Sequence, residues 1–133
     1  MTQPARTILV VDDEAPLRRV LDRALTRVGY AVVTAASAEA AYALLETTPV
    51  DAALLDIRLP TMSGLALYLS IVHRWPQLDG CMAIMTGDAD AEEVRTWLEQ
   101  HRCAVLHKPF DLVEVEAWLA HLWEIRERGT GNG

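Results

Sequence analysis

Short apolar runs alternate with amphipathic segments along the whole chain. The runs are Arg6–Val11, Tyr30–Ala35, Asp51–Asp56, Cys81–Thr86 and Cys103–His107, and each is followed by apolar residues at helical spacing. Continuous apolar strands, as opposed to strands that alternate with polar residues, are typical of a sheet buried on both faces. The pattern therefore predicts an α/β fold in which five strands form a parallel sheet between two layers of helices.

The helical segments have recognisable ends. They are predicted over residues 15–28, from the cap Ser37 to about Thr47, over 65–75, from Asp90 to about Gln100, and from Asp111 to about Arg128. Five strand–helix units with right-handed crossovers favour a doubly wound, flavodoxin-like sheet with the strand order 2-1-3-4-5. We expect residues 1–128 to form one domain and residues 129–133 to form a short flexible tail.

Composition narrows the functional classes. The chain has 133 residues, 51% of them hydrophobic, and a net charge of −7, which argues against direct binding to nucleic acid. No apolar run approaches the roughly 20 residues of a membrane helix, and the N-terminus lacks the features of a signal peptide. We therefore expect a cytoplasmic protein, with Cys81 and Cys103 acting as small apolar residues at strand starts.

Polar residues stand where the predicted strands end. Asp12 and Asp13 follow the first strand, Asp56 ends the third, Thr86 ends the fourth and Lys108 follows the fifth. Because parallel strands end at one edge of a sheet, these side chains should converge there. Clustered carboxylates repel one another unless a cation joins them, and carboxylates without histidine or cysteine partners favour Mg²⁺ over zinc.

Four segments in this order resemble the response-regulator receiver domain of two-component signalling: "ILVVDDE", "LLDIRLPTMSG", "IMTGDAD" and "HKPF". The resemblance covers about Arg6 to Glu127. It implies that Asp56 is the phosphoacceptor and that the backbone carbonyl of Arg58 joins the aspartates around Mg²⁺. It also implies a switch hydroxyl at Thr86, a phosphoryl-pairing lysine at Lys108, and a cis bond between Lys108 and Pro109.

The same resemblance implies the function. The domain would accept a phosphoryl group from a histidine kinase or phosphotransfer protein. It would signal rather than act as an enzyme, although it would assist its own phosphorylation and dephosphorylation. A partner protein or a second copy would bind the face formed by the predicted helix 90–100, the strand 103–107 and the helix 111–128. Both a domain that works alone and the receiver part of a longer regulator remain open.

Three features depart from the family pattern or leave alternatives open. Val105 stands where most receivers carry an aromatic switch residue. Arg58 and Asp88, at the positions that tune phosphoryl lifetime, either form an ion pair across the mouth of the site or are two independent solvated charges. The tryptophans of the last two helices favour core packing, with a partner surface as the second interpretation. These tryptophans are Trp97, Trp118 and Trp123.

Two other protein classes also use an aspartate nucleophile or a doubly wound sheet. A phosphatase of the haloacid-dehalogenase type needs a second acid two residues after its nucleophile, where this chain has Arg58. A flavodoxin must cradle a phosphate in its first loop, and the "DDEAP" segment would repel that phosphate. Both alternatives are therefore disfavoured.

Overall fold

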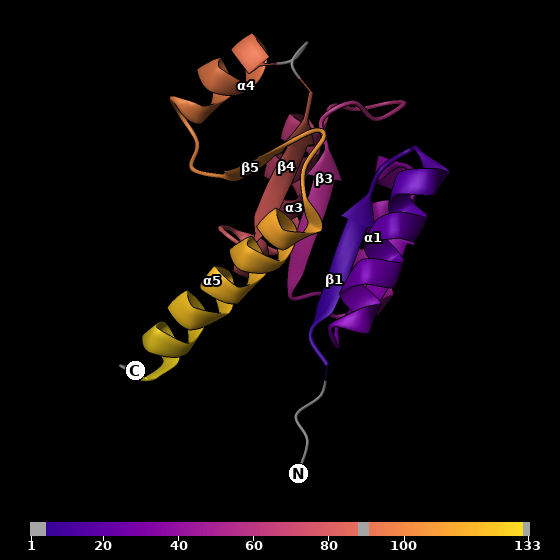
Figure 1. Cartoon of the computed structure of the whole chain (residues 1–133). Coiled ribbons are helices and arrows are strands. Elements are labelled where there is room, and N and C mark those ends of the chain that lie inside the picture. The colour runs from indigo at the N-terminus through magenta and orange to yellow at the C-terminus, as the bar shows by residue number, and fades with distance from the viewer. Residues whose placement is uncertain (1–4, 88–90, 132–133) are drawn as a thin grey trace.

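The computed structural model describes residues 5–87 and 91–131, which form alternating strands and helices (Figure 1). The strands are β1 (Thr7–Val11), β2 (Ala31–Ala35), β3 (Ala52–Asp56), β4 (Met82–Thr86) and β5 (Ala104–His107). The helices are α1 (Ala15–Arg27), α2 (Ala38–Thr47), α3 (Gly64–Arg74), α4 (Ala91–Leu98) and α5 (Leu112–Gly131), with a 3₁₀ turn, η1, at Pro76–Leu78.

All strand pairs are parallel, and the order in the sheet is β2-β1-β3-β4-β5, as predicted. The register aligns the carboxyl ends of the strands. Val11 pairs with Leu55, and Asp56 pairs with Met85 one step further on. Thr86 in turn pairs with His107. Residues that end neighbouring strands are therefore brought to one edge of the sheet.

The direction of the crossovers distributes the helices over both faces. The chain moves one way across the sheet from β1 to β2 and the other way from β2 onward, so right-handed crossovers place α1 and α2 on opposite faces. Helix α1 contacts α5. On the other face Tyr42 of α2 packs against Trp75 after α3, and Tyr68 of α3 packs against Trp97 of α4.

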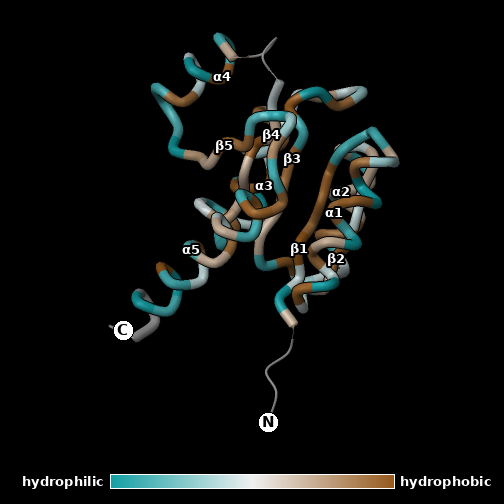
Figure 2. Tube along the Cα trace, viewed as in Figure 1, coloured by the Kyte–Doolittle hydropathy of each residue, from teal (hydrophilic) through white to brown (hydrophobic). Residues whose placement is uncertain are grey.

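The core lies along the three central strands. Every residue of β3 and β4 is buried, as are residues 8–11 of β1. Figure 2 shows this as a brown centre beneath helices that alternate between brown and teal. Burying one large apolar side chain stabilises the folded state by about 1.5–3 kcal/mol. The polar edge of the sheet is therefore supported by the most firmly packed strands.

Element boundaries differ from the predictions by small amounts. Each strand begins one residue later than predicted. The carbonyls of Arg6 and Cys81 nevertheless accept hydrogen bonds of the ladder type, from Ala31 N at 2.9 Å and Ala53 N at 3.1 Å. Helix α5 ends at Gly131, so residues 129–131 of the expected tail continue the helix. A glycine costs a helix only about 1 kcal/mol, which the preceding turns can overcome.

Two helix ends have the expected local features. Ser37 caps α2 by accepting a hydrogen bond from Ala40 N at 3.1 Å, as predicted. Gly29 follows the C-cap of α1 with a φ of 107°, a left-handed conformation that favours glycine. The predicted capping role of Asp90 lies outside the described residues.

Trp97, Trp118 and Trp123 pack against the core, which confirms the first interpretation of these residues. The indole of Trp123 also donates a hydrogen bond to Tyr30 Oη at 2.8 Å. Both cysteines are free, and burial raises the pKa of the Cys103 thiol to about 12, as befits an apolar packing residue. In residues 5–87 and 91–131, no helix has the length and apolar character that crossing a bilayer requires.

Candidate functional site

Asp12 lies at the end of β1 and is fixed by its backbone as well as by its side chain. Its N–H donates to the carbonyl of Ala35 at 3.1 Å, and its own carbonyl accepts from Arg18 Nη1 at 2.7 Å. Its Oδ1 accepts from the backbone N–H of Glu14 at 2.8 Å. These contacts hold the fully buried carboxylate of Asp12 in one orientation. The contact from Arg18 could not be predicted from the sequence motif.

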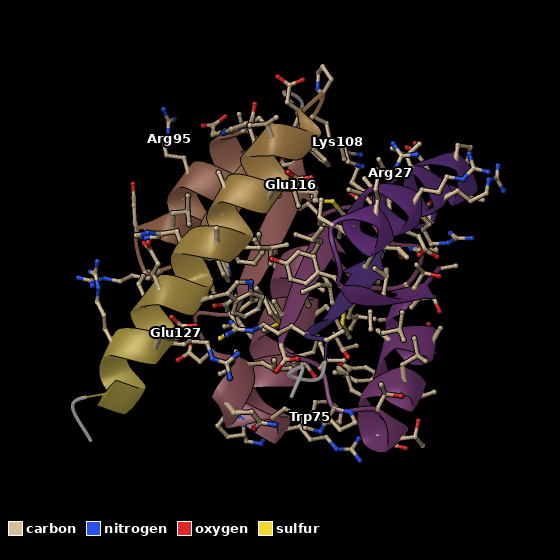
Figure 3. The ribbon with its side chains drawn as sticks, turned by 60° about the horizontal axis from the view of Figure 1, so that its bottom comes forward. Arg27, Trp75, Arg95, Lys108, Glu116 and Glu127 are labelled. Atoms are coloured by element: carbon tan, nitrogen blue, oxygen red, sulfur yellow. The ribbon has the colours of Figure 1, made fainter. Side chains whose placement is uncertain are left out.

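Asp56 ends β3, the neighbouring strand, and is 5% exposed. Lys108 joins it to Asp12. The ammonium of Lys108 lies 3.1 Å from Asp12 Oδ2 and 3.3 Å from Asp56 Oδ1. The backbone N–H of Lys108 donates to the carbonyl of Thr86 at 2.7 Å, and the peptide bond to Pro109 is cis, as the resemblance implied. In Figure 3, Lys108 lies at the end of the molecule opposite Trp75.

Asp13 completes an acidic cluster with Asp12 and Asp56. Each residue offers a carboxylate oxygen, and the three oxygens lie within 4.8 Å of one another. Asp13 is exposed and the other two are buried, so the cluster opens to solvent on one side. Three ionised carboxylates beside one ammonium leave two uncompensated negative charges. An all-oxygen donor set with solvent access suits Mg²⁺, which keeps several water ligands.

The local electrostatics act against the ionised form of Asp56. Burial raises the pKa of Asp56, the charge of Asp12 raises it further, and Lys108 opposes both effects. Burial alone would lower the pKa of Lys108. The hydrogen bond and charge of Asp12, together with those of Asp56, outweigh that effect and raise it. The site therefore favours a bound positive charge beyond the one that Lys108 supplies.

Thr86 ends β4 and is fully buried. Its hydroxyl donates to the carbonyl of Gly87 at 3.2 Å. The hydroxyl is therefore engaged with its own loop, on the strand next to Asp56. A ligand on Asp56 would have to compete for it.

The β3–α3 loop, residues 57–63, packs closely on Asp56. The backbone N–H of Arg58 lies 3.5 Å from Asp56 Oδ1, and Gly64 N donates to the carbonyl of Ile57 at 2.8 Å. A Cβ on Gly64 would lie 2.2 Å from the carbonyl oxygen of Asp56, so only glycine fits there. No role was predicted for this glycine, although it directly follows Ser63, the N-cap residue of α3.

The structure tests the predictions for Val105, Pro109 and Asp88 only in part. Val105 lies within β5, partly buried, opposite Ile84, and its effect on the switch stays a prediction. Pro109 is exposed beside Lys108. Asp88 lies outside the described residues, so its pairing with Arg58 also stays a prediction.

Comparison with known proteins adds independent information. Curated relatives include the DNA-binding transcriptional regulator NtrC of Klebsiella pneumoniae, 39% identical over 81% of this chain and 23% of that protein. NtrC of Escherichia coli K12 is 39% identical over 88% of this chain and 25% of that protein. The chain thus spans about a quarter of the length of these relatives.

Solved structures agree with this result. A CheY-like response regulator receiver domain protein from Methanospirillum hungatei matches with a TM-score of 0.83 at 26% identity, over 94% of this chain and 98% of that one. NtrX from Brucella abortus matches with a TM-score of 0.78 at 27% identity, over 94% of this chain and 29% of that one.

The family models give the same answer. Residues 8–120 match the response regulator receiver domain, and the haloacid-dehalogenase alternative is not supported by any of these matches. The match covers the strands from residue 8 of β1 to the end of β5, together with the acidic cluster at their carboxyl ends. The chain therefore belongs to the response regulator receiver domain family of two-component systems.

Proposed function

We propose that Asp56 accepts a phosphoryl group from a histidine kinase or phosphotransfer protein. Mg²⁺ would be held by Asp12, Asp13, Asp56 and the backbone carbonyl of Arg58. The observation that carries the proposal is the position of Asp56. Its carboxylate lies within reach of two further carboxylates and is 3.3 Å from the Lys108 ammonium.

The chemistry follows from these groups. A carboxylate oxygen of Asp56 forms a bond to phosphorus while the bond from phosphorus to the donor's imidazole nitrogen breaks. The electron pair stays on the imidazole. Bound Mg²⁺ would neutralise charge on the transferred group and align it. Lys108 would exchange part of its contact with Asp56 for a phosphoryl oxygen, and its ammonium would supply positive charge to the transferred group.

Phosphorylation would change the contacts of Thr86. A phosphoryl group adds strong acceptor oxygens, for which the Thr86 hydroxyl would leave the Gly87 carbonyl. That movement would pull on the loop that leads to α4. In α4 only Val94 is buried, so the helix is held by few core contacts and would shift readily.

The output face proposed here is formed by α4, β5 and α5. Val113, near the start of α5, is 72% exposed and gives this face an apolar residue for a partner protein or a second copy. With Val105 in β5, the helix would carry the signal without an aromatic side chain that changes position. The NtrC relatives are transcriptional regulators about four times as long, so the output would reside in further domains or in partner proteins.

Two further properties complete the proposal. The net charge of −7 argues that this domain does not touch nucleic acid itself. A cytoplasmic location would suit a protein that meets histidine kinases and their phosphodonors.

The test is phosphorylation by a small-molecule donor. The protein is incubated with acetyl phosphate or phosphoramidate and Mg²⁺, and its intact mass is measured. We expect one phosphoryl adduct, lost in Asp56→Asn and retained in the control Asp51→Asn, which changes an aspartate before the same strand. The absence of an adduct on the unaltered protein, or its survival in Asp56→Asn, would overturn the proposal.

A further inference from the structure

The β3–α3 loop carries Arg58, whose carbonyl is the one backbone ligand in the proposed Mg²⁺ site. Its two ends are fixed by Ile57 N, which donates to Met85 O at 3.0 Å, and by the cap Ser63, which accepts from Ala66 N at 3.1 Å. Thr61, in the middle of the loop, is exposed. Arg58 and Ser63 also form an isolated antiparallel β-bridge, so the backbone at Arg58 is joined to the far end of the loop. Contacts that hold the middle of the loop therefore add to the restraint on the Arg58 carbonyl.

Helix α2 supports one side of this loop. Glu39 and Tyr42 are three residues apart, so they lie on the same side of the helix. Thr61 Oγ1 donates to Glu39 Oε1 at 2.8 Å. Hydrogen bonds lower the pKa of the Glu39 carboxyl; a backbone N–H has the larger effect and Thr61 the smaller one. The acceptor therefore stays ionised at neutral pH.

Tyr42 makes the second connection. Its hydroxyl donates to Ser70 Oγ of α3 at 2.5 Å and lies 3.9 Å from the sulfur of Met62 in the loop. Its ring stacks against Trp75, with the ring centroids 6.4 Å apart. Tyr42 is thus held at both ends while it contacts the loop.

A surface hollow of about 490 Å³ borders the loop, lined by Ile57, Arg58, Leu59, Thr61, Met62, Ser63 and Glu93. All of these residues except Glu93 of α4 belong to the loop itself. Side chains do not pack across an open hollow, so the contacts from α2 to Thr61 and Met62 supplement the backbone restraints on the loop.

We propose that Thr61 and Tyr42, with Glu39 as the acceptor of Thr61, are positioning residues that set the Mg²⁺ affinity of the site. They touch neither the metal nor the phosphoryl group. They hold the loop so that the Arg58 carbonyl is placed before the ion arrives, and binding then loses less conformational entropy. The inference rests on the proposed function, since it assumes the ligand set given there.

The test measures Mg²⁺ binding to the unphosphorylated protein by calorimetry. Thr61→Val removes the hydroxyl that binds Glu39, and Tyr42→Phe removes the hydroxyl but keeps the ring on Trp75. We expect each variant to raise the Mg²⁺ dissociation constant about three- to tenfold, and the double variant to raise it further. The rate of phosphorylation by acetyl phosphate should recover at saturating Mg²⁺.

Matched variants separate positioning from general destabilisation. Glu46→Gln breaks the 2.6 Å ion pair between α2 and Arg74 of α3 without touching the loop, and should leave Mg²⁺ affinity unchanged. Thr61→Ser keeps the hydroxyl and should restore normal affinity. Thermal unfolding shows whether each variant is folded.

Two results would overturn the inference. In the first, the unaltered protein and the folded double variant bind Mg²⁺ equally well, or Glu46→Gln weakens binding as much as Thr61→Val does. The proposed function would then stand and only the positioning role would fall. In the second, the unaltered protein binds no Mg²⁺, and the proposed ligand set fails together with the inference.

Discussion

Helices α3 and α4 follow neighbouring strands of the same sheet, yet they are held very differently. Five of the 11 residues of α3 are buried, whereas α4 has eight residues and buries only Val94. Strand β3 before α3 is buried throughout, whereas β5 after α4 buries only Leu106. Asp56, the proposed phosphoacceptor, thus lies in a firmly packed unit, while the segment that would report phosphorylation lies in a loosely packed one.

A protein that switches between two states needs both a rigid region and a region that moves easily. Carboxylates that must be kept close together need a support that does not relax, because each would move away from the others. A segment that responds to one phosphorylation must instead have two conformations of similar free energy, since a single modification supplies only a few hydrogen bonds. The firmly packed β3 and α3 precede Thr86 in the chain, and the loosely packed α4 and β5 follow it.

The largest expected effect concerns stability. Leu54→Ala in β3 should lower the free energy of unfolding by about 2–5 kcal/mol, because the cavity lies among fully buried neighbours. Val94→Ala in α4 removes two carbons from a looser site and should cost about 1–2 kcal/mol. Denaturant unfolding measures both, and equal losses would show that the two units are packed alike.

A substitution at Gly64 tests how closely α3 must approach β3. In Gly64→Ala the new methyl group would lie 2.2 Å from the Asp56 carbonyl, so α3 or the strand end must shift. We expect a loss of about 1–3 kcal/mol and slower phosphorylation by acetyl phosphate. Gly87→Ala is the control for stability, because a Cβ there meets nothing within 4 Å. A variant of normal stability and activity would refute the close approach.

The raised pKa of Asp56 predicts a pH-dependent effect. The folded state disfavours the ionised carboxylate, so Asp56→Asn should raise the melting temperature at pH 7, when no Mg²⁺ is added. The pKa of Asp56 in the folded state is above the ordinary value for an aspartate, so the unaltered protein regains this stability as Asp56 is protonated on acidification. The difference between the two proteins should therefore shrink below the raised pKa. A variant that is less stable at pH 7 would contradict the prediction.

The smallest expected effect concerns Arg58 and Asp88 as a shield of the phosphoryl group. Exposed ion pairs contribute about 0–1 kcal/mol, which corresponds to at most about a fivefold change in rate. Arg58→Ala should accelerate autodephosphorylation within that range, as followed by the decay of the adduct in intact mass. An unchanged rate would favour two independent solvated charges.

Much of the site was predictable from residue order. Asp12, Asp56, Thr86 and Lys108 each stand at the end of an apolar run, and parallel pairing places such ends together whatever the details of packing. Their identities also carry the chemistry, since carboxylates, a hydroxyl and an ammonium have few other reasons to converge. The polarity of Asp13 and its place next to Asp12 extended the cluster correctly.

Contacts between distant residues were not predictable in this way. Arg18 bonds the Asp12 carbonyl, and Thr61 bonds Glu39 across 22 positions, but no local pattern of apolar and polar residues encodes either pair. The bond from Trp123 to Tyr30 joins residues 93 positions apart. Such pairs arise only after the helices have docked, because docking selects which exposed polar groups come within hydrogen-bonding range.

The sequence by itself determined the strand order, the edge that bears the chemistry and the residues at that edge. It could do so because burial and chain direction are local or topological properties. Only the tertiary structure decided that Lys108 bridges two carboxylates, that Gly64 must lack a side chain, and that α2 supports the β3–α3 loop. Those features depend on differences of a few tenths of an ångström in the distances between elements, and such distances are set by packing.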